Sequence, residues 1–218
     1  MILIAPSHLL GALWGLLFAA PWAWWLTPPS RRSGVALAVV TLALSLGALT
    51  LGMLALTWAG ALETGAVLGG TLAACGAGLM VAWRAGLRLA GRRLGVPQMG
   101  RAIRAQPVAS AVTLIALGLA ALIVLEAVYW PFSADDAVSI YADHSRRIFQ
   151  ARALPQGEGL YEAYPMLLPF SHVYAYLLAG RVHEYLARVA VAALALGTLG
   201  ATFALGRALY GWRAGLAA

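Results

Sequence analysis

Residues 35–58, VALAVVTLALSLGALTLGMLALTW, form an apolar stretch that no charged side chain interrupts. An α-helix rises about 1.5 Å per residue and the hydrocarbon core of a bilayer is about 30 Å thick, so roughly 20 such residues can cross it. The rest of the chain has the same character, since 62% of its 218 residues are hydrophobic, 11% are charged and the mean hydropathy is +0.81. These values lie outside the range of soluble domains, and they predict an all-α integral membrane protein.

Further apolar segments flank this one on both sides. The predicted membrane helices are residues 9–26, 35–58, 65–83, 108–129, 165–178 and 186–205. The fifth is short and contains Pro165, Pro169 and His172, so it must be tilted, extended by flanking residues or shielded from lipid by protein. We therefore expect a bundle of about six transmembrane helices, with one polar loop, residues 130–164, between the fourth and the fifth.

Arginines collect in two of the loops, and basic residues mark the cytoplasmic side of a membrane protein. Arg31 and Arg32 lie between the first two helices. The loop between the third and fourth helices contains no acid and carries Arg84, Arg88, Arg92, Arg93, Arg101 and Arg104. If both loops face the cytoplasm, the N-terminus and residues 130–164 lie on the extracytoplasmic side of the cell's inner membrane. The same topology returns Arg181 and Arg188 to the cytoplasmic side.

Several function classes are disfavoured by the charged and metal-binding residues. The net charge of +7 comes from arginines between apolar runs, where they meet anionic lipid, so nucleic-acid binding is not expected. No charged residue lies deep within a predicted span, which argues against a transporter. His144 and His172 lack partners at zinc-like spacing, and the single cysteine, Cys75, allows no intrachain disulfide.

Two glycine pairs have the spacing that lets membrane helices approach closely, Gly11 with Gly15 and Gly65 with Gly69. The chain contains 24 glycines in all. Such spacings are therefore expected by chance, and no close helix contact is predicted from them.

The polar loop begins with a helix-start pattern. The Ser133 hydroxyl can accept hydrogen bonds from free backbone N–H groups, and Asp136 three residues later completes a capping box. The helix that follows has an amphipathic face that could lie along the membrane surface, formed by Ala137, Tyr141, His144 and Ile148. Asp143 and Arg147 are spaced for an ion pair, and residues 154–157, LPQG, should end the helix.

Four segments in the second half of the chain carry a family resemblance. Residues 136–141, DAVSIY, are followed by Arg146 and then by residues 164–169, YPMLLP. This order and spacing resemble the first external loop of the C-type glycosyltransferases of family 39, which include protein mannosyltransferases and aminoarabinose transferases. Residues 184–188, EYLAR, and 206–213, GRALYGWR, resemble that family's next helix hairpin and its outer boundary. The resemblance covers about residues 108–218.

The resemblance implies a catalytic centre in the polar loop. In that family an aspartate of the first external loop stands at the catalytic centre and the donor is a polyprenyl-phosphate sugar, which assigns the role to Asp136, with Asp135 as the second candidate. A carboxylate within hydrogen-bond reach can take the proton of an acceptor hydroxyl or amine as it attacks the anomeric carbon. The predicted substrate-binding residues are Arg146, Tyr141, Tyr161 and Tyr164.

Most of these residues also have simpler interpretations. Asp135 and Asp136 could cap a helix, or could together coordinate Mg²⁺ or Mn²⁺, although no metal ligand is assigned. Arg146, Arg147 and Arg152 could contact the donor phosphate, but they could equally form a solvated face or contact lipid headgroups. Tyr161 and Tyr164 could anchor the loop at the membrane interface.

Two departures from the family set the expected domain organisation. Three additional helices come first, so residues 1–95 should form an extra membrane region and residues 96–218 the N-terminal part of the glycosyltransferase-like domain. The chain then stops after the third family helix, which predicts a fragment or one part of a split enzyme. The sequence therefore predicts sugar transfer to an unidentified glycan, lipid or protein acceptor. The alternative is a non-catalytic multi-pass scaffold or a subunit that binds lipid-linked glycans.

Overall fold

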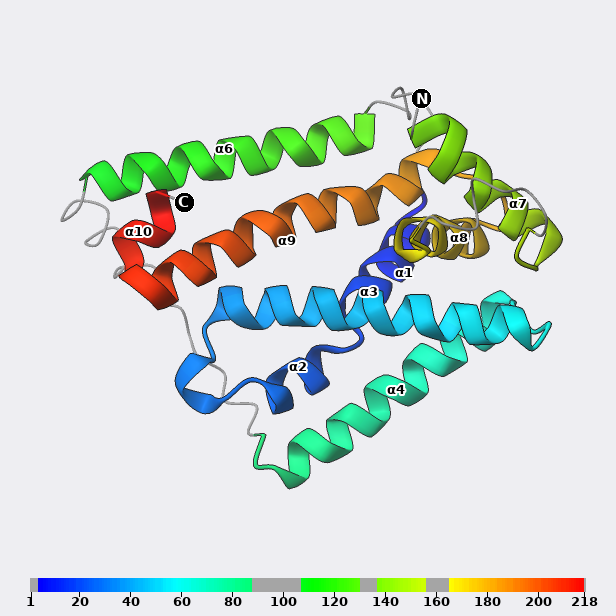
Figure 1. The fold of residues 1–218 in the computed structure, drawn as a ribbon, viewed down its shortest axis with the longest axis horizontal. Coiled ribbons are helices and arrows are strands. Elements are labelled where there is room, and N and C mark those ends of the chain that lie inside the picture. Colours follow the sequence, from blue (N-terminus) through cyan, green and yellow to red (C-terminus); the bar gives the residue numbers. More distant parts are fainter. Residues whose placement is uncertain (1–3, 88–106, 130–136, 156–164, 218) are drawn as a thin grey trace.

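The computed structural model describes residues 4–87, 107–129, 137–155 and 165–217. Within these ranges the secondary structure is entirely helical (Figure 1). In chain order the helices are α1 (Pro6–Leu17), α2 (Ala20–Leu26), the 3₁₀ turn η1 (Pro29–Arg31), α3 (Gly34–Trp58), α4 (Thr64–Arg84), α6 (Pro107–Tyr129), the π-helical turn η2 (Ala137–Ala142), α7 (Asp143–Ala151), α8 (Leu167–Ala179), α9 (Glu184–Tyr210) and α10 (Trp212–Ala217).

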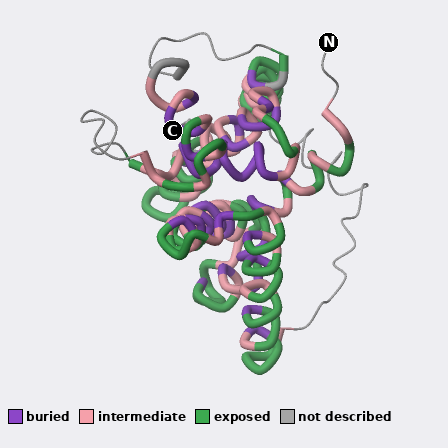
Figure 2. The backbone as a smooth tube through the Cα atoms, turned by 90° about the vertical axis from the view of Figure 1, so that its right-hand side faces the viewer, coloured by how far each residue is buried: buried purple, intermediate pink, exposed green. Residues whose placement is uncertain are grey.

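Five segments are long and apolar enough to cross a membrane. They are Pro6–Leu26, Gly34–Trp58, Thr64–Arg84, Ser110–Ala127 and Glu184–Tyr210. Large apolar side chains such as Leu51, Leu114 and Leu205 are more than 60% exposed on their outer faces. Figure 2 shows exposed residues along the long helices and buried residues toward the middle of the molecule. This distribution suits a lipid solvent, and it indicates a multi-pass membrane protein.

The α8 helix is the exception among the six predicted spans. It has 13 residues, so it is about 20 Å long and too short for a hydrocarbon core of about 30 Å. Every residue from 169 to 177 is buried, by packing against α1, α3, α7 and α9. Among the described residues five segments, against about six expected, are thus long enough to cross, and α8 fits the expected alternative of a segment that protein shields from lipid.

The first span is broken between α1 and α2. Pro21 has no N–H to donate to the carbonyl four residues earlier, and its ring crowds that carbonyl. The backbone N–H of Ala19 instead donates to Ser45 Oγ of α3 over 3.1 Å, which keeps this buried group paired. Beyond the break, Trp22 Nε1 donates to the Ala74 carbonyl of α4 over 2.8 Å. The break therefore lets one apolar segment contact both α3 and α4.

Glycines allow α1 to lie close against α8. A Cβ added to Gly15 would be 2.3 Å from Tyr174 Cε1, and the Tyr174 hydroxyl donates to the Gly11 carbonyl over 2.8 Å. At Gly65 and Gly69 an added Cβ would meet nothing within 4 Å. The first pair is thus a close-contact motif, contrary to the expectation of chance spacing, whereas the second pair makes no such contact.

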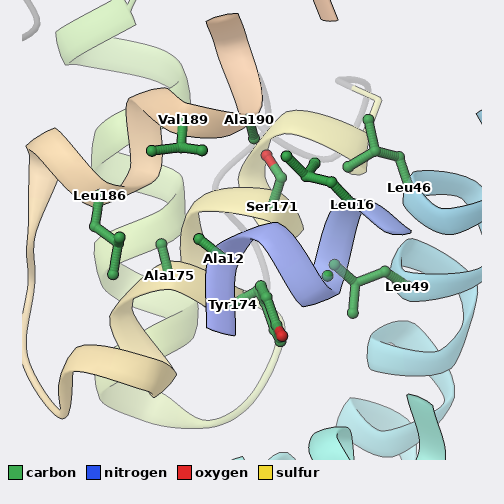
Figure 3. Close-up of a pocket in the computed structure, with 11 residues that line it drawn as sticks. Ala12, Leu16, Leu46, Leu49, Ser171, Tyr174, Ala175, Leu186, Val189 and Ala190 are labelled. Atoms are coloured by element: carbon green, nitrogen blue, oxygen red, sulfur yellow. The ribbon is translucent and has the colours of Figure 1, made fainter. Parts of the chain in front are cut away.

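A small void of about 20 Å³ remains between α1, α3, α8 and α9 (Figure 3). A single water needs about 10–15 Å³ by a comparable measure, so the void is too small for a sugar. Its lining in Figure 3 is mostly apolar, and the Ser171 hydroxyl already donates to the Leu168 carbonyl over 2.8 Å. We regard it as a packing void and not as a ligand site.

Candidate functional site

Four segments meet at one end of the bundle, which we name the α7 end (Figure 1). They are α7, residues 59–63 between α3 and α4, the C-terminus of α8 and the start of α9. Arg146 of α7 forms an ion pair with Glu184, the first residue of α9. The Thr64 hydroxyl of α4 donates to the Leu177 carbonyl of α8 over 3.0 Å. These contacts join segments that are far apart in sequence around the helix that follows the candidate catalytic aspartates.

The opposite end of the bundle carries the arginines that precede α3 and end α4. Arg31, Arg32 and Arg84 lie there, far from α7 (Figure 1). The Arg32 guanidinium lies 3.9 Å from the Trp24 ring centroid, and its Nε donates to the Thr27 carbonyl over 2.9 Å. All the acids within the described ranges lie at the α7 end: Glu63, Glu126, Asp143 and Glu184. The described acids therefore gather at one end, as the sequence predicted, but arginines lie at both ends, since Arg146, Arg147 and Arg152 belong to the α7 end.

Arg181 and Arg188 lie at the α7 end, and not with Arg31, Arg32 and Arg84 as the sequence predicted. The reason is the short α8, which begins and ends at the same end of the bundle (Figure 1). α9 then starts beside α7 and runs back toward the opposite end. The α8–α9 turn is thus on the same side as the polar loop.

The helix predicted in the polar loop is present, but it packs differently from the expectation. The expected ion pair forms between Asp143 Oδ2 and Arg147 Nε, over 2.8 Å. His144 and Ile148 are buried, and α7 packs against α8. The face expected to lie on the membrane surface therefore lies on protein. The helix ends at Ala151, before the predicted residues 154–157.

A buried polar contact connects α7 to α8. Ser145 Oγ lies 3.3 Å from His172 Nδ1, and it donates a short hydrogen bond to the Tyr141 carbonyl. α8 is outside the five candidate spans, and burial lowers the pKa of His172 to about 4, so the ring is neutral at physiological pH. A serine–histidine nucleophile would need an accessible serine whose proton is directed to the ring. Ser145 is fully buried and donates elsewhere, so this pair is a structural contact.

Tyr176 lies close enough to the Arg146–Glu184 ion pair for both charges to act on its hydroxyl. Its side chain is fully buried, with Phe149 packed edge-on at a centroid distance of 5.7 Å. Its hydroxyl has no hydrogen-bond partner among the described residues. Burial, followed by the charge of Glu184, raises the pKa of this hydroxyl to about 12, so it remains protonated.

The structure describes two of the six predicted site residues. Arg146 is paired with Glu184, and its side chain is 37% exposed. Tyr141 is half-buried, and its carbonyl accepts from Ser145. The other four, Asp135, Asp136, Tyr161 and Tyr164, lie outside the described residues. Nowhere in the described ranges do three or more His, Cys, Asp or Glu side chains gather as a metal site would require, so the metal alternative rests on Asp135 and Asp136.

Sequence reasoning did not predict the partner of Arg146. Glu184 is 38 residues away along the chain, and no local spacing rule reaches that far. In the sequence, residues 184–188 carry only the family resemblance. The pair is partly exposed, with side-chain exposures of 37% for Arg146 and 26% for Glu184, so solvent screens it in part.

Reversing the charge at Arg146 tests this pair. Arg146→Glu places a second carboxylate against Glu184, and we expect the free energy of unfolding to fall by about 1–2 kcal/mol, between the values for exposed and buried pairs. The double variant Arg146→Glu/Glu184→Arg restores the attraction and should recover most of the loss, measured by unfolding titration in mixed micelles. A double variant no more stable than the single one would show that the pair does not join α7 to α9.

Arg152 is a second residue whose contacts the sequence did not predict. It ends α7 in the left-handed conformation, with φ of 55°, and it is the only described non-glycine residue with positive φ. Its guanidinium lies 4.6 Å from the Phe149 ring centroid, and Nη1 donates a long hydrogen bond of 3.5 Å to the Leu62 carbonyl. A cation is thereby held above the turn between α3 and α4.

The α7 end thus combines three features: the short helix α7, its ion pair to α9, and Arg152, which is held by Phe149 and the Leu62 carbonyl. Such a site can hold an anionic group at the membrane interface. Its described side chains include no accessible nucleophile paired with a base. Comparison of the sequence and the structure with protein-family models, curated proteins and solved structures finds no match.

Proposed function

We propose that the chain is a membrane glycosyltransferase, whole or in part, that transfers a sugar from a polyprenyl phosphate to an extracytoplasmic acceptor. One observation carries most weight: α7, which follows Asp136, lies at the bundle end opposite Arg31, Arg32 and Arg84. Arginine-rich loops favour the cytoplasmic side, which supports the proposal that the α7 end lies on the outer side of the inner membrane. A lipid-linked sugar in the outer leaflet would reach the protein there.

In the proposed reaction Asp136 is the general base. Its carboxylate takes the proton of an acceptor hydroxyl or amine while the acceptor oxygen or nitrogen attacks the anomeric carbon. The bond from that carbon to the phosphate oxygen breaks, and polyprenyl phosphate leaves. A single displacement inverts the configuration at the anomeric carbon. Asp135 and Arg146 support the charges of this step, and Tyr141, Tyr161 and Tyr164 contact the sugar.

Transfer from a labelled polyprenyl-phosphate sugar tests the proposal. The assay uses membranes that contain the chain together with any sequence that continues its gene, so that no missing part limits the reaction. We expect label to enter an acceptor, in contrast to membranes without the protein. Binding of the lipid-linked sugar without transfer would favour the non-catalytic binding subunit instead.

A further inference from the structure

An apolar groove lies between α3 and α4, with Phe18 at its base. It encloses about 230 Å³ and is lined by Phe18, Ala48, Leu49, Gly52, Met53, Leu56, Ala66, Val67, Gly70, Thr71 and Ala74. The two helices diverge from the turn that joins them, so the groove has α3 for one wall and α4 for the other (Figure 1). At Gly52 and Gly70 an added Cβ would meet nothing within 4 Å. The absence of side chains at these two positions keeps the groove open.

The groove is open on the side that lipid would occupy. Both of its walls are candidate membrane spans, and Ala48, Gly52, Ala66 and Gly70 are exposed along its rim. The hydroxyl in its lining, that of Thr71, accepts from Trp14 Nε1 over 2.9 Å and donates to the Leu68 carbonyl over 2.9 Å. Since this hydroxyl is already satisfied, the groove offers apolar contacts to whatever occupies it.

One end of the groove reaches the α7 end of the bundle. Leu56 lines the groove, and its carbonyl accepts from the Ala61 N–H of the α3–α4 turn over 2.8 Å. Arg152 reaches the carbonyl of the next residue in that turn, Leu62. The groove therefore lies between two candidate membrane spans whose connecting turn Arg152 contacts.

The charge at this end favours an anionic head. Arg146 and Arg147 form ion pairs with Glu184 and Asp143, whereas Arg152 has no ion pair with any acid that the structure describes. Its hydrogen bond to the Leu62 carbonyl is long, so most of its five N–H donors remain for an anion. Glu63 lies on the same turn, but it is exposed, where solvent screens its charge.

We propose that this groove holds the isoprenoid chain of polyprenyl phosphate, with the phosphate at Arg152. One water needs about 10–15 Å³ by the same measure, so the 230 Å³ of the groove has room for part of an apolar lipid chain. The identity of the lipid rests on the proposed function, whereas the placement of a single apolar chain rests on the groove. The proposal gives a role to α3 and α4, which precede the part of the chain that carries the family resemblance.

Photocrosslinking tests the placement. The full chain is reconstituted in bilayer discs with a polyprenyl phosphate that carries a photoactivatable group on its chain, and the crosslinked peptides are mapped. We expect crosslinks concentrated on the groove-lining residues of α3 and α4. Gly70→Leu fills the groove and should lower the yield at least fivefold. Gly69→Leu is the matched control, because it changes an adjacent exposed glycine outside the lining and should leave the yield unchanged.

The placement of the phosphate at Arg152 is tested separately with the same probe. Arg152→Gln should lower the crosslinking of polyprenyl phosphate at least threefold while leaving that of uncharged polyprenol unchanged, and Arg152→Lys should retain the signal. Crosslinks spread evenly over all lipid-exposed helices, or equal losses in the Gly70 and Gly69 variants, would overturn the proposal. A diacyl phospholipid probe that labels the groove as strongly would overturn the choice of lipid.

The outcome is independent of catalysis, because crosslinking requires no turnover. Asp136→Asn should crosslink as the unchanged chain does. Crosslinking in the groove without any sugar transfer would therefore refute the proposed function and leave the lipid groove standing. Sugar transfer without crosslinking in the groove would refute the lipid groove and leave the proposed function standing.

Discussion

Asp136→Asn is expected to lower sugar transfer by at least about a hundredfold, because the amide cannot take the proton that the acceptor loses. Asparagine has nearly the same shape as aspartate, so the loop should keep its fold. The measurement is transfer of labelled sugar from polyprenyl phosphate, with membrane insertion followed in parallel. Insertion should not change.

Asp143→Asn is the matched control for this substitution. It removes a carboxylate from the same region, but Asp143 pairs with Arg147 on a partly exposed side of α7. Losing such a pair changes stability by at most about 1 kcal/mol, and transfer should fall less than threefold. Full activity in Asp136→Asn would remove the assignment of the base. A large loss confined to Asp135→Asn would move the base to that residue.

Gly15→Leu is expected to cause the largest loss of stability. The leucine Cβ would have to occupy a position 2.3 Å from Tyr174 Cε1, so α1 and α8 must separate. Overpacking of this kind costs about 1–3 kcal/mol, and separation also breaks the Tyr174–Gly11 hydrogen bond, which contributes about 1 kcal/mol. We therefore expect the free energy of unfolding to fall by roughly 2–4 kcal/mol, measured by unfolding titration in mixed micelles.

Gly69→Leu again provides the control. It introduces the same side chain on a membrane helix, at a site where an added Cβ meets nothing within 4 Å. Its stability should not fall, and it could rise slightly, because leucine favours helix more than glycine does. Equal losses in the two variants would mean that the Gly15 site is not a close contact.

The spans were predictable from the sequence to within a few residues. Residues 35–58 were expected as a helix and α3 is Gly34–Trp58, because an apolar run long enough to cross a bilayer has few other conformations. Ser33 sets its start by accepting from the Ala36 N–H over 3.2 Å. The break at Pro21 was not predicted. The prediction of a span rests on its average hydropathy, which does not change when proline removes one backbone N–H donor.

Contacts between spans were less predictable. Apolar periodicity is weak in a helix that is hydrophobic all round, so the sequence does not say which face meets protein and which meets lipid. Gly11 and Gly15 pack against α8, whereas Gly65 and Gly69 have the same spacing and pack against nothing. The apolar face of α7 has the predicted helical spacing. Packing against a buried helix such as α8 requires the same spacing as packing on a membrane surface, so the sequence could not tell the two apart.

In the candidate site, contacts between residues close in sequence were predictable, but contacts between distant segments were not. The Asp143–Arg147 pair follows from helical spacing and is present. The Arg146–Glu184 pair depends on α8 turning back within the bundle, which no spacing in the sequence encodes. The roles of Asp135, Asp136, Tyr161 and Tyr164 remain predictions, because these residues lie outside the described ranges.

The topology of the α7 end can be measured directly by cysteine labelling. Cys75 is replaced by alanine, and single cysteines are placed at three exposed positions: Ser30, Gln150 and Arg181. A membrane-impermeant maleimide applied to intact cells, or to spheroplasts if an outer envelope is present, should label Gln150→Cys and Arg181→Cys but not Ser30→Cys. Labelling of Ser30→Cys alone would put the α7 end in the cytoplasm and contradict extracytoplasmic sugar transfer. Labelling of Gln150→Cys without Arg181→Cys would mean that α8 crosses the membrane after all.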